Sequence, residues 1–304
     1  MEIGYTKDLL ILPFDHRGTF GDKMFNAKGR ALTQEEIAKI SEFKMIIYEA
    51  YKKSLTMGVK KEWAGILVDE QYGTAVILDA KKNGVLFATT IEKSGQEEFD
   101  FEYGSEFGQH LETFDAPIGK ALVRYNVDGD GEMNKRQLTR LRQLGDYIHS
   151  HNRKYLFELL VPATKAQLEK FGGEKSKYDL NLRPKLMVRA IHEIQAAGVA
   201  PDIWKLEGME DPEDVKMVVS ACHANGTKAG VIVLGRGENA EKVKKWLIAG
   251  ANIPGVIGFA IGRTVFWDPL VKYYNKQITK EQAIAEIADV YKMFVDLWFN
   301  ARKK

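Results

Sequence analysis

Short apolar segments recur eight times along the chain, and stretches with helical patterning separate most of them. Runs of this length that are rich in Val, Ile, Leu and Phe suit strands buried on both faces. Eight strands that alternate with helices, without a break for a second core, predict a single-domain (β/α)8 barrel over residues 1–304. A doubly wound sheet with a small appended domain is the alternative. The segments are 9–14, 64–69, 84–91, 120–125, 154–161, 203–207, 230–234 and 256–261.

Amphipathic helices are expected between these strands. The helix predicted at 33–57 begins with Thr33 and Glu36, which have the spacing of a capping box, and Gly58 follows as a stop signal. A last helix over 280–300 would complete the outer ring of a barrel. The other clear helical patterns cover 134–152, 181–197, 211–225 and 239–249.

The composition limits the classes of partner and compartment. A formal net charge of +2 gives no electrostatic reason to expect nucleic acid or a membrane surface as a partner. No apolar run approaches the ~20 residues of a membrane span, and no export signal is visible at the N-terminus. Cys222 is the single cysteine, which suits a reducing compartment. We therefore expect a cytoplasmic protein that binds a small molecule, and a homo-oligomer is left open.

A lysine interrupts the sixth apolar segment, where a buried parallel strand should be almost continuously apolar. Lys205 follows Ile203 and Trp204 in that segment. Desolvation disfavours the ammonium form, and a neutral amine in a dry pocket can attack a ketone to form a Schiff base. The structural alternatives are a lysine paired with a neighbouring carboxylate and one that reaches out from a strand end.

Two further charged residues interrupt apolar segments. Burial of Glu158 is expected to raise its pKa, which would suit a residue that both gives and takes a proton. A structural ion pair is the alternative. Lys120 could lower the pKa of Lys205 by repulsion or hold a substrate group, but a strand-end lysine on the surface fits the pattern as well. In a barrel these side chains would face the same C-terminal rim.

Polar groups also follow the other predicted strands, the third of which is followed by Glu92 and Lys93. Glycine turns follow the last two strands, where barrel enzymes often bind phosphate through backbone N–H groups. Ordinary turns and a salt-bridged rim are the alternatives. The predicted substrate and phosphate contacts are Asp15, His16, Arg17, Asp69, Lys93, Gly235, Arg236, Gly237, Gly262 and Arg263.

The sequence predicts neither a metal site nor a nucleotide cofactor. Residues 126–131 place oxygen ligands as a calcium loop does, but Gln137 stands at the twelfth position, where a bidentate carboxylate is needed. The six histidines form no ligand set at strand ends. No Gly-x-Gly-x-x-Gly or Walker-type loop is present. We therefore expect a protein that works without a cofactor.

Several of these motifs, in this order, resemble the class I (Schiff-base) aldolases related to tagatose-1,6-bisphosphate aldolase. The chain is more similar still to the aldolase-like domain fused to 5-dehydro-2-deoxygluconokinase in inositol catabolism. The resemblance implies that Lys205 forms the Schiff base, that Glu158 shuttles protons and that Lys120 assists. The matching stretches are FDHRG (14–18), VDEQYG (68–73), KALVRYN (120–126), FELL (157–160), WKLE (204–207) and IGR (261–263).

The same resemblance implies a carbon–carbon lyase that cleaves a phosphorylated keto sugar or keto sugar acid to dihydroxyacetone phosphate and an aldehyde. The expected substrate is 5-dehydro-2-deoxygluconate 6-phosphate, which would release malonate semialdehyde, with Arg17 or Lys93 on its carboxylate. The alternatives are a tagatose-1,6-bisphosphate-type or sulfosugar-phosphate aldolase, a transaldolase, and a non-catalytic sugar-phosphate-binding barrel. The chain departs from the tagatose-bisphosphate members at His16, where they have Gln, and at 234–237, where they have a Ser-Ala-Gly loop.

Overall fold

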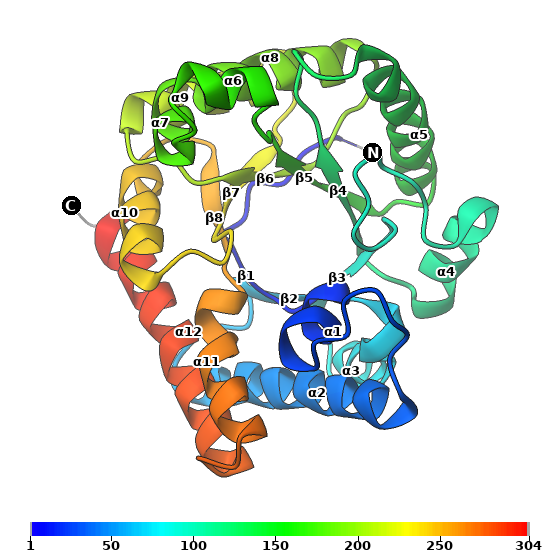
Figure 1. Ribbon diagram of the computed structural model, residues 1–304, viewed down its shortest axis with the longest axis vertical. Coiled ribbons are helices and arrows are strands. Elements are labelled where there is room, and N and C mark those ends of the chain that lie inside the picture. The colour runs from blue at the N-terminus through cyan, green and yellow to red at the C-terminus, as the bar shows by residue number, and fades with distance from the viewer. Residues whose placement is uncertain (1, 303–304) are drawn as a thin grey trace.

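A closed barrel of eight parallel strands occupies the centre of the protein (Figure 1), as a computed structural model describes it for residues 2–302. Each strand pairs with the next one in the sequence, and β8 pairs with β1 to close the ring. This confirms the predicted (β/α)8 barrel and excludes a doubly wound sheet. The strands are β1 (Leu9–Pro13), β2 (Ala64–Val68), β3 (Leu86–Thr90), β4 (Ile118–Arg124), β5 (Lys154–Leu160), β6 (Ile203–Glu207), β7 (Gly230–Leu234) and β8 (Val256–Ala260).

Helices form a ring around the outside of the barrel (Figure 1). Several connections between strands carry more than one helix, and a short 3₁₀ helix (Gly104–Glu106) precedes α4. The α-helices are α1 (Gly18–Met24), α2 (Gln34–Thr56), α3 (Glu70–Lys82), α4 (Phe107–Phe114), α5 (Gly131–Ser150), α6 (Lys165–Lys170), α7 (Lys175–Asn181), α8 (Arg183–Ala196), α9 (Pro212–Cys222), α10 (Ala240–Ala251), α11 (Arg263–Tyr274) and α12 (Lys280–Arg302).

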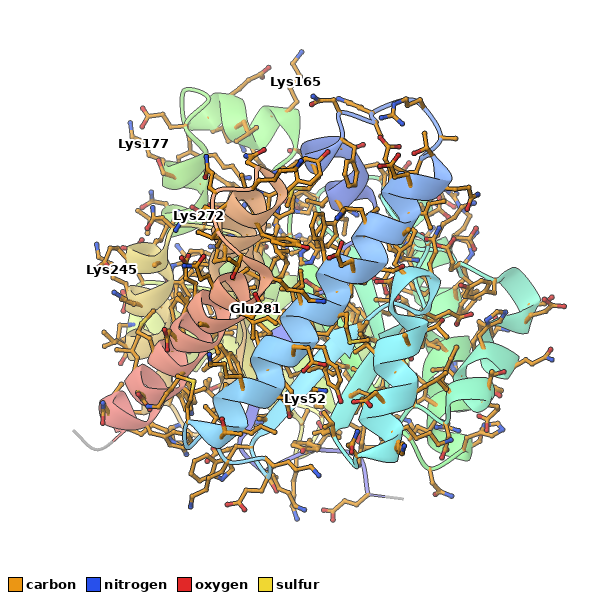
Figure 2. The ribbon with its side chains drawn as sticks, turned by 90° about the horizontal axis from the view of Figure 1, so that it is seen from below. Lys52, Lys165, Lys177, Lys245, Lys272 and Glu281 are labelled. Carbon is orange, nitrogen blue, oxygen red and sulfur yellow. The ribbon has the colours of Figure 1, made fainter. Side chains whose placement is uncertain are left out.

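The predicted capping box is present at the start of α2. The Glu36 N–H donates to Thr33 Oγ1 at 3.2 Å, and the Thr33 N–H donates to the Glu36 carboxylate at 2.8 Å. These bonds satisfy backbone donors that a helix start leaves free. The final predicted helix is α12, which packs along α2 (Figure 2).

The outer faces of the helices are charged, as Lys52, Lys245 and Lys272 illustrate (Figure 2). Between helices and strands lies the large apolar core, and a smaller apolar cluster fills the barrel interior. None of the helices within residues 2–302 combines the length and the apolar character that crossing a membrane requires. The buried members of the interior cluster are Leu9, Ile11, Leu67, Ala88, Ile118, Leu156, Ile203, Ile232, Ile257 and Ala260.

The interior cluster explains where the charged strand residues lie. Ile118, Leu156 and Ile203 belong to this cluster on β4, β5 and β6. Because side chains alternate along a strand, the residue two positions further on projects to the same side. On these three strands that residue is Lys120, Glu158 or Lys205, one layer closer to the C-terminal end of the barrel. The apolar layer thus forms the floor under a charged layer.

Candidate active site

Three charged side chains from adjacent strands meet inside the C-terminal mouth of the barrel. The register pairs Glu158 of β5 directly with Lys205 of β6, and Lys120 comes from β4 on the other side. One oxygen, Glu158 Oε2, lies 2.9 Å from Lys205 Nζ and also 2.9 Å from Lys120 Nζ. All three side chains are buried. The strand order therefore places one acid between two amines.

Lys120 contacts carboxylates on three sides. Its Nζ lies 2.9 Å from Asp15 Oδ2, 2.6 Å from Glu92 Oε1 and 2.9 Å from Glu158 Oε2. Burial lowers the pKa of Lys120, but the three negative charges outweigh burial and hold this pKa well above its usual value. Lys120 is therefore a permanent cation in the floor of the mouth, rather than a surface lysine at a strand end.

The pKa of Glu158 differs from the sequence-based expectation. Burial does raise it, as expected, but the charges of Lys120 and Lys205 lower it by more, so that the pKa of Glu158 lies below its usual value. The prediction of a raised pKa was wrong because it considered burial without the two ammonium groups that share one oxygen. Glu158 is consequently an anion at neutral pH.

Glu92 is a residue of the mouth for which the sequence predicts no role. It lies two residues after the end of β3 and is 5 % exposed. Its Oε1 accepts a hydrogen bond from Lys120, whereas its Oε2 is buried and has no hydrogen-bond partner in the part of the chain that the structure describes. Burial raises the pKa of Glu92 further than Lys120 and Arg17 lower it, so that this pKa lies above its usual value. A polar residue next to an apolar segment was the only sequence signal.

Asp15 and His16 line the mouth as predicted contact residues. Burial raises the pKa of Asp15, but Lys120 and Lys205 lower it by more, and the net direction is downward. Burial lowers the pKa of His16 to about 3, which makes its ring neutral at physiological pH. Among residues 2–302, His16 Nδ1 is buried and has no hydrogen-bond partner, and the ring packs edge-on against Phe266. His16 can therefore serve as a neutral hydrogen-bonding group.

Arg17 is already bound by other groups of the protein, whereas Lys93 is exposed. The Arg17 guanidinium donates to the Glu102 carboxylate at 2.8 Å and to the carbonyl oxygen of Glu92 at 2.6 Å. These contacts fix the segment after β3 and leave little of the Arg17 charge for a ligand. Lys93 is exposed at the edge of the mouth. Arg124, which was not among the predicted contacts, lines the mouth as well and donates to the Gln96 carbonyl.

The mouth contains two cavities that share a wall. The first, of about 270 Å³, reaches toward the segment after β3 and is lined by Arg17, Glu92 and Lys93; we call it the β3 lobe. The second, of about 220 Å³, reaches toward the loops after β7 and β8; we call it the β8 lobe. Lys205 and Glu158 line both lobes. A ligand that contacts Lys205 can therefore extend in both directions.

The β8 lobe is built from the two late glycine loops. Arg263 is the first residue of α11, and the N-cap Gly262 leaves the helix start without a side-chain cap. A Cβ added to Gly237 would lie 2.7 Å from the Arg263 guanidinium carbon, and φ of Gly237 is +72°. The positive φ favours glycine where this loop passes Arg263. The lobe combines a guanidinium with the positive end of a helix, which suits an anion.

The other two residues of the first glycine loop contribute less than predicted. The Arg236 guanidinium lies 2.8 Å from Asp179 and 3.1 Å from Glu207, so that two carboxylates already neutralise it. Its carbonyl oxygen accepts a hydrogen bond from Arg263 Nη2 at 3.0 Å. Gly235 does not line the lobe, although Arg236 and Gly237 do. Arg236 therefore orients the loop, and Arg263 lines the cavity as a guanidinium that is not held between two carboxylates.

Asp69 lies away from both lobes, at the start of α3. It caps this helix by accepting the Tyr72 N–H at 2.9 Å, and it forms an ion pair with Lys44 of α2. Lys44 is fully buried and also donates to the carbonyl oxygens of Phe14 and His16. The sequence-based assignment of Asp69 as a substrate contact has no geometric support, and the residue instead anchors the segment that carries His16.

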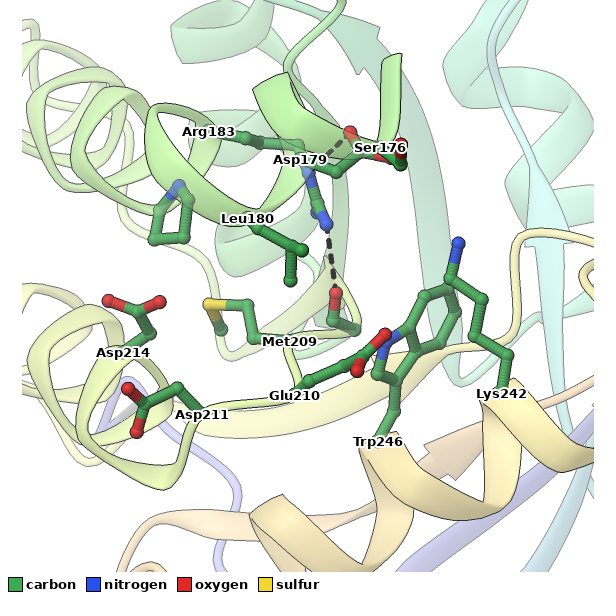
Figure 3. Close-up of a pocket in the computed structure, with 12 residues that line it drawn as sticks. Ser176, Asp179, Leu180, Arg183, Met209, Glu210, Asp211, Asp214, Lys242 and Trp246 are labelled. Carbon is green, nitrogen blue, oxygen red and sulfur yellow. Dashed lines mark hydrogen bonds and ion pairs between the residues drawn. The ribbon is translucent and has the colours of Figure 1, made fainter. Parts of the chain in front are cut away.

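A separate cavity of about 370 Å³ lies between α7, α8, the loop after β6 and α10 (Figure 3). Arg183 crosses its wall and donates to Asp179 and to the Gly208 carbonyl at 3.0 Å each (Figure 3). Neither Lys205 nor Glu158 lines this cavity. The cluster of perturbed ionisable groups therefore identifies the barrel mouth as the candidate active site.

Residues 126–131 have a structural role at the start of α5. Asp130 caps the helix by accepting the N–H groups of Glu132 and Met133 at 2.9 and 3.0 Å. Gln137 is buried and accepts the Phe99 N–H at 2.8 Å. Within residues 2–302, no group of three or more His, Cys, Asp or Glu side chains is arranged to hold a metal ion.

Comparisons with known proteins place the fold and the family. No curated protein matches the chain. A fructose-bisphosphate aldolase from Plasmodium falciparum, solved in complex with TRAP and a small-molecule inhibitor, superposes with a TM-score of 0.70 at 10% identity, over 98% of this chain and 92% of that one. A Corynebacterium glutamicum protein superposes with a TM-score of 0.55 at 16% identity, over 94% of this chain and 86% of that one. At these identities the likeness shows a shared fold alone. The family model of DUF2090, described as an uncharacterized protein conserved in bacteria, matches residues 3–302, and the chain belongs to this family.

Proposed function

We propose that this protein is a class I aldolase that cleaves a phosphorylated keto sugar or keto sugar acid. The observation that carries the proposal is the buried Lys205 amine, 2.9 Å from Glu158 in a cavity that extends on both sides of it. Lys120 contacts the same oxygen of Glu158, so that the acid keeps a cationic partner when Lys205 loses its proton to attack a ketone. A site that only bound sugar phosphates would need neither a buried amine nor a buried acid next to it.

The proposed reaction proceeds through a Schiff base. Lys205 Nζ attacks the ketone carbon, a proton reaches the carbinolamine oxygen through Glu158, and water leaves to give an iminium ion. The hydroxyl on the carbon beyond the cleaved bond then gives its proton to a carboxylate of the mouth, the carbon–carbon bond breaks, and its electron pair moves toward the iminium nitrogen to form an enamine while the aldehyde leaves. Protonation of the enamine carbon and hydrolysis of the imine release dihydroxyacetone phosphate and the free lysine. The iminium is the electron sink, so we propose an enzyme that needs neither a metal nor a cofactor.

We assign the phosphate to the β8 lobe. Arg263 and the backbone around Gly237 and Gly262 surround this cavity at the start of α11. The shared wall of the two lobes contains Lys205, which fits a phosphorylated ketone with its carbonyl carbon at the amine. The rest of the substrate, which becomes the aldehyde, would then occupy the β3 lobe.

The β3 lobe favours a substrate whose far end carries an anion. Lys93 is exposed at its edge and Arg124 lies in its wall, whereas Arg17 is bound to Glu102. Our preferred substrate is 5-dehydro-2-deoxygluconate 6-phosphate, which would release malonate semialdehyde and place the protein in inositol catabolism as a cytoplasmic, single-domain enzyme. The tagatose-bisphosphate and sulfosugar-phosphate reactions are the main alternatives within the same chemistry.

Borohydride trapping tests the Schiff base. With dihydroxyacetone phosphate present, reduction should fix label on the peptide that contains Lys205, and mass spectrometry locates it. Lys205→Arg should abolish trapping because a guanidinium does not form the imine. Lys154→Arg is the matched control, because Lys154 is also a strand lysine but pairs with Asp202 at 2.8 Å, away from the mouth. Label on Lys120 instead of Lys205 would contradict the assignment.

A panel of phosphorylated ketoses and keto acids, assayed with and without an acceptor aldehyde, then separates the candidate activities. An aldolase releases free dihydroxyacetone phosphate without an acceptor. A transaldolase turns over only when the acceptor is added. A non-catalytic barrel binds members of the panel but neither cleaves them nor becomes labelled.

A further inference from the structure

Two carboxylates, Asp15 and Glu92, line the β3 lobe but not the β8 lobe and have no assigned role in the reaction above. The lowered pKa of Asp15 makes it the weaker base of the two, which leaves Glu92. The side chain of Glu92 is 7 % exposed, and Oε1 lies 2.6 Å from Lys120 Nζ. Its other oxygen, Oε2, is buried and has no hydrogen-bond partner within residues 2–302. Buried polar atoms are normally satisfied, so an orphaned carboxylate oxygen in a cavity wall calls for a donor that the ligand supplies.

The cavity geometry indicates which part of a ligand reaches Glu92. Glu92 lines the β3 lobe and not the β8 lobe, whereas Glu158 lines both. With the phosphate in the β8 lobe and the ketone carbon at Lys205, the carbons beyond the cleaved bond lie in the β3 lobe. The first of these carbons carries the hydroxyl that becomes the aldehyde oxygen. Glu92 is therefore on the side of this hydroxyl.

The charged groups around Glu158 and Glu92 differ, which supports different roles for the two acids. Glu158 contacts two ammonium groups through one oxygen, which stabilises its anion and makes it a weak base. The carboxylate of Glu92 has one ammonium group at hydrogen-bonding distance within residues 2–302, that of Lys120, and burial outweighs this contact and raises the pKa of Glu92. An acid whose pKa lies closer to neutral is the better proton acceptor at physiological pH.

We propose that Glu92, and not Glu158, removes the proton from the hydroxyl of the carbon that becomes the aldehyde. The inference depends on the proposed aldolase function. In this step the O–H bond breaks and its proton moves to Glu92. The O–H electron pair forms the carbonyl bond of the aldehyde, and the carbon–carbon electron pair becomes the enamine. In the reverse direction Glu92 returns the proton to the aldehyde oxygen.

The Glu92→Gln variant separates this role from a structural one. Glutamine keeps the shape and an oxygen that can accept from Lys120, but it cannot take up a proton. Schiff-base formation and exchange of the enamine carbon's proton involve no aldehyde hydroxyl. The variant should therefore still be trapped by borohydride with dihydroxyacetone phosphate, and it should still exchange the C3 proton of this ketone with deuterium.

Cleavage of 5-dehydro-2-deoxygluconate 6-phosphate by Glu92→Gln should fall by about 100-fold or more, the usual contribution of a general base. In this variant the fall of kcat/KM toward low pH, which protonation of Glu92 causes in the wild-type protein, should disappear. Glu98→Gln is the matched control, because Glu98 lies in the same segment but pairs with Arg136 and Arg140 outside the mouth. It should cleave at the wild-type rate.

Three outcomes would overturn the inference, and they are distinguishable. If Glu92→Gln cleaves the substrate within about threefold of the wild-type rate, the loss is far smaller than a general base contributes. Another group then accepts the hydroxyl proton, and the aldolase function stands. If trapping and deuterium exchange fall as far as cleavage does, Glu92 acts on the amine and not on the hydroxyl. If the wild-type protein itself is not trapped, the aldolase function fails and this role of Glu92 fails with it.

Discussion

At the scale of single residues, Lys120 is the cation that allows three acids to share one buried site. Its amine lies within 3 Å of Asp15, Glu92 and Glu158. Lys120→Met would leave these carboxylates close together with Lys205 as the remaining amine of the cluster. Breaking a buried ion pair by removing one partner typically costs about 3–5 kcal/mol. We expect a loss of this size in the free energy of unfolding near pH 7, measured by urea denaturation.

The stability lost in Lys120→Met should depend on pH. The pKa values of Asp15 and Glu158 are lowered, so their contribution to stability is present above the pKa of an unfolded carboxyl and is lost as the pH falls through the folded values. Without Lys120 both pKa values rise, and protonation relieves the repulsion at a higher pH. The difference between wild type and Lys120→Met should therefore shrink between pH 7 and about pH 4. A difference that is constant with pH would contradict the charge assignment.

Lys135→Met is the control for the loss of an ordinary ion pair. Lys135 pairs with Glu132 on α5, and both side chains are 74 % exposed. Exposed pairs of this kind contribute little to stability because water screens them. The control should unfold as the wild-type protein does at every pH.

At the scale of elements, the loops after β7 and β8 act together. Arg263 of α11 donates to the Arg236 carbonyl, and Thr264 Oγ1 donates to the Glu238 carbonyl at 2.8 Å. The start of α11 is thereby fixed against the preceding loop. A cation at this position and the positive helix end both favour a phosphate in the β8 lobe.

Arg263→Ala should therefore weaken binding of dihydroxyacetone phosphate more than it slows the chemical step. Losing hydrogen bonds to a charged group corresponds to about a 10- to 100-fold rise in the concentration that half-saturates borohydride trapping. The trapping rate at saturation should change little. Arg189→Ala, at an exposed arginine that pairs with Asp128, should change neither quantity. A larger effect on the saturated rate than on half-saturation would place Arg263 at the reacting carbon instead.

The eight strands and six of the twelve α-helices within residues 2–302 were predictable from the sequence, because each strand is a short apolar run and the α2 cap is a local motif. The other helices, α1, α3, α4, α6, α7 and α11, were not predicted. Glu92 was harder to interpret. The third apolar segment ends at Ile91, and Glu92 is buried because the segment after β3 folds back, with a bridge between Glu92 and Phe101. No periodicity along the chain encodes such a return. Its burial depends on contacts that only the folded chain makes.

The electrostatics of the site could not be predicted from the sequence for a related reason. An apolar strand shows that Glu158 is buried, but not that Lys120 and Lys205 reach the same oxygen. The sign of the pKa shift depends on that coincidence. Likewise, the glycines around Arg236 indicate a loop, but its two carboxylate partners come from distant elements. The position of these side chains at the rim of the barrel was predictable from the sequence, whereas their ion-pair partners and charge states depend on the three-dimensional arrangement.

At the scale of the whole molecule, the Lys44–Asp69 pair joins the outer helix ring to the barrel. Lys44 lies on α2 and is fully buried, and it also donates to the carbonyl oxygen of Phe14 at 2.6 Å and to that of His16 at 3.1 Å. The pair therefore ties α2, the start of α3 and the segment after β1 into one unit. That segment carries Asp15 and His16 into the mouth, so the stability of the site depends on this junction.

Asp69→Asn tests this structural role against the substrate contact expected from the sequence. Asparagine can still cap α3 by accepting the Tyr72 N–H, so the change removes mainly the charge opposite Lys44. An unpaired buried ammonium should reduce the free energy of unfolding by about 3–5 kcal/mol. Asp146→Asn, at a 74 % exposed residue that pairs with Arg142, should leave the melting temperature unchanged. If Asp69→Asn instead raised the half-saturating dihydroxyacetone phosphate concentration at full stability, Asp69 would be a ligand contact after all, and the junction would not depend on this pair.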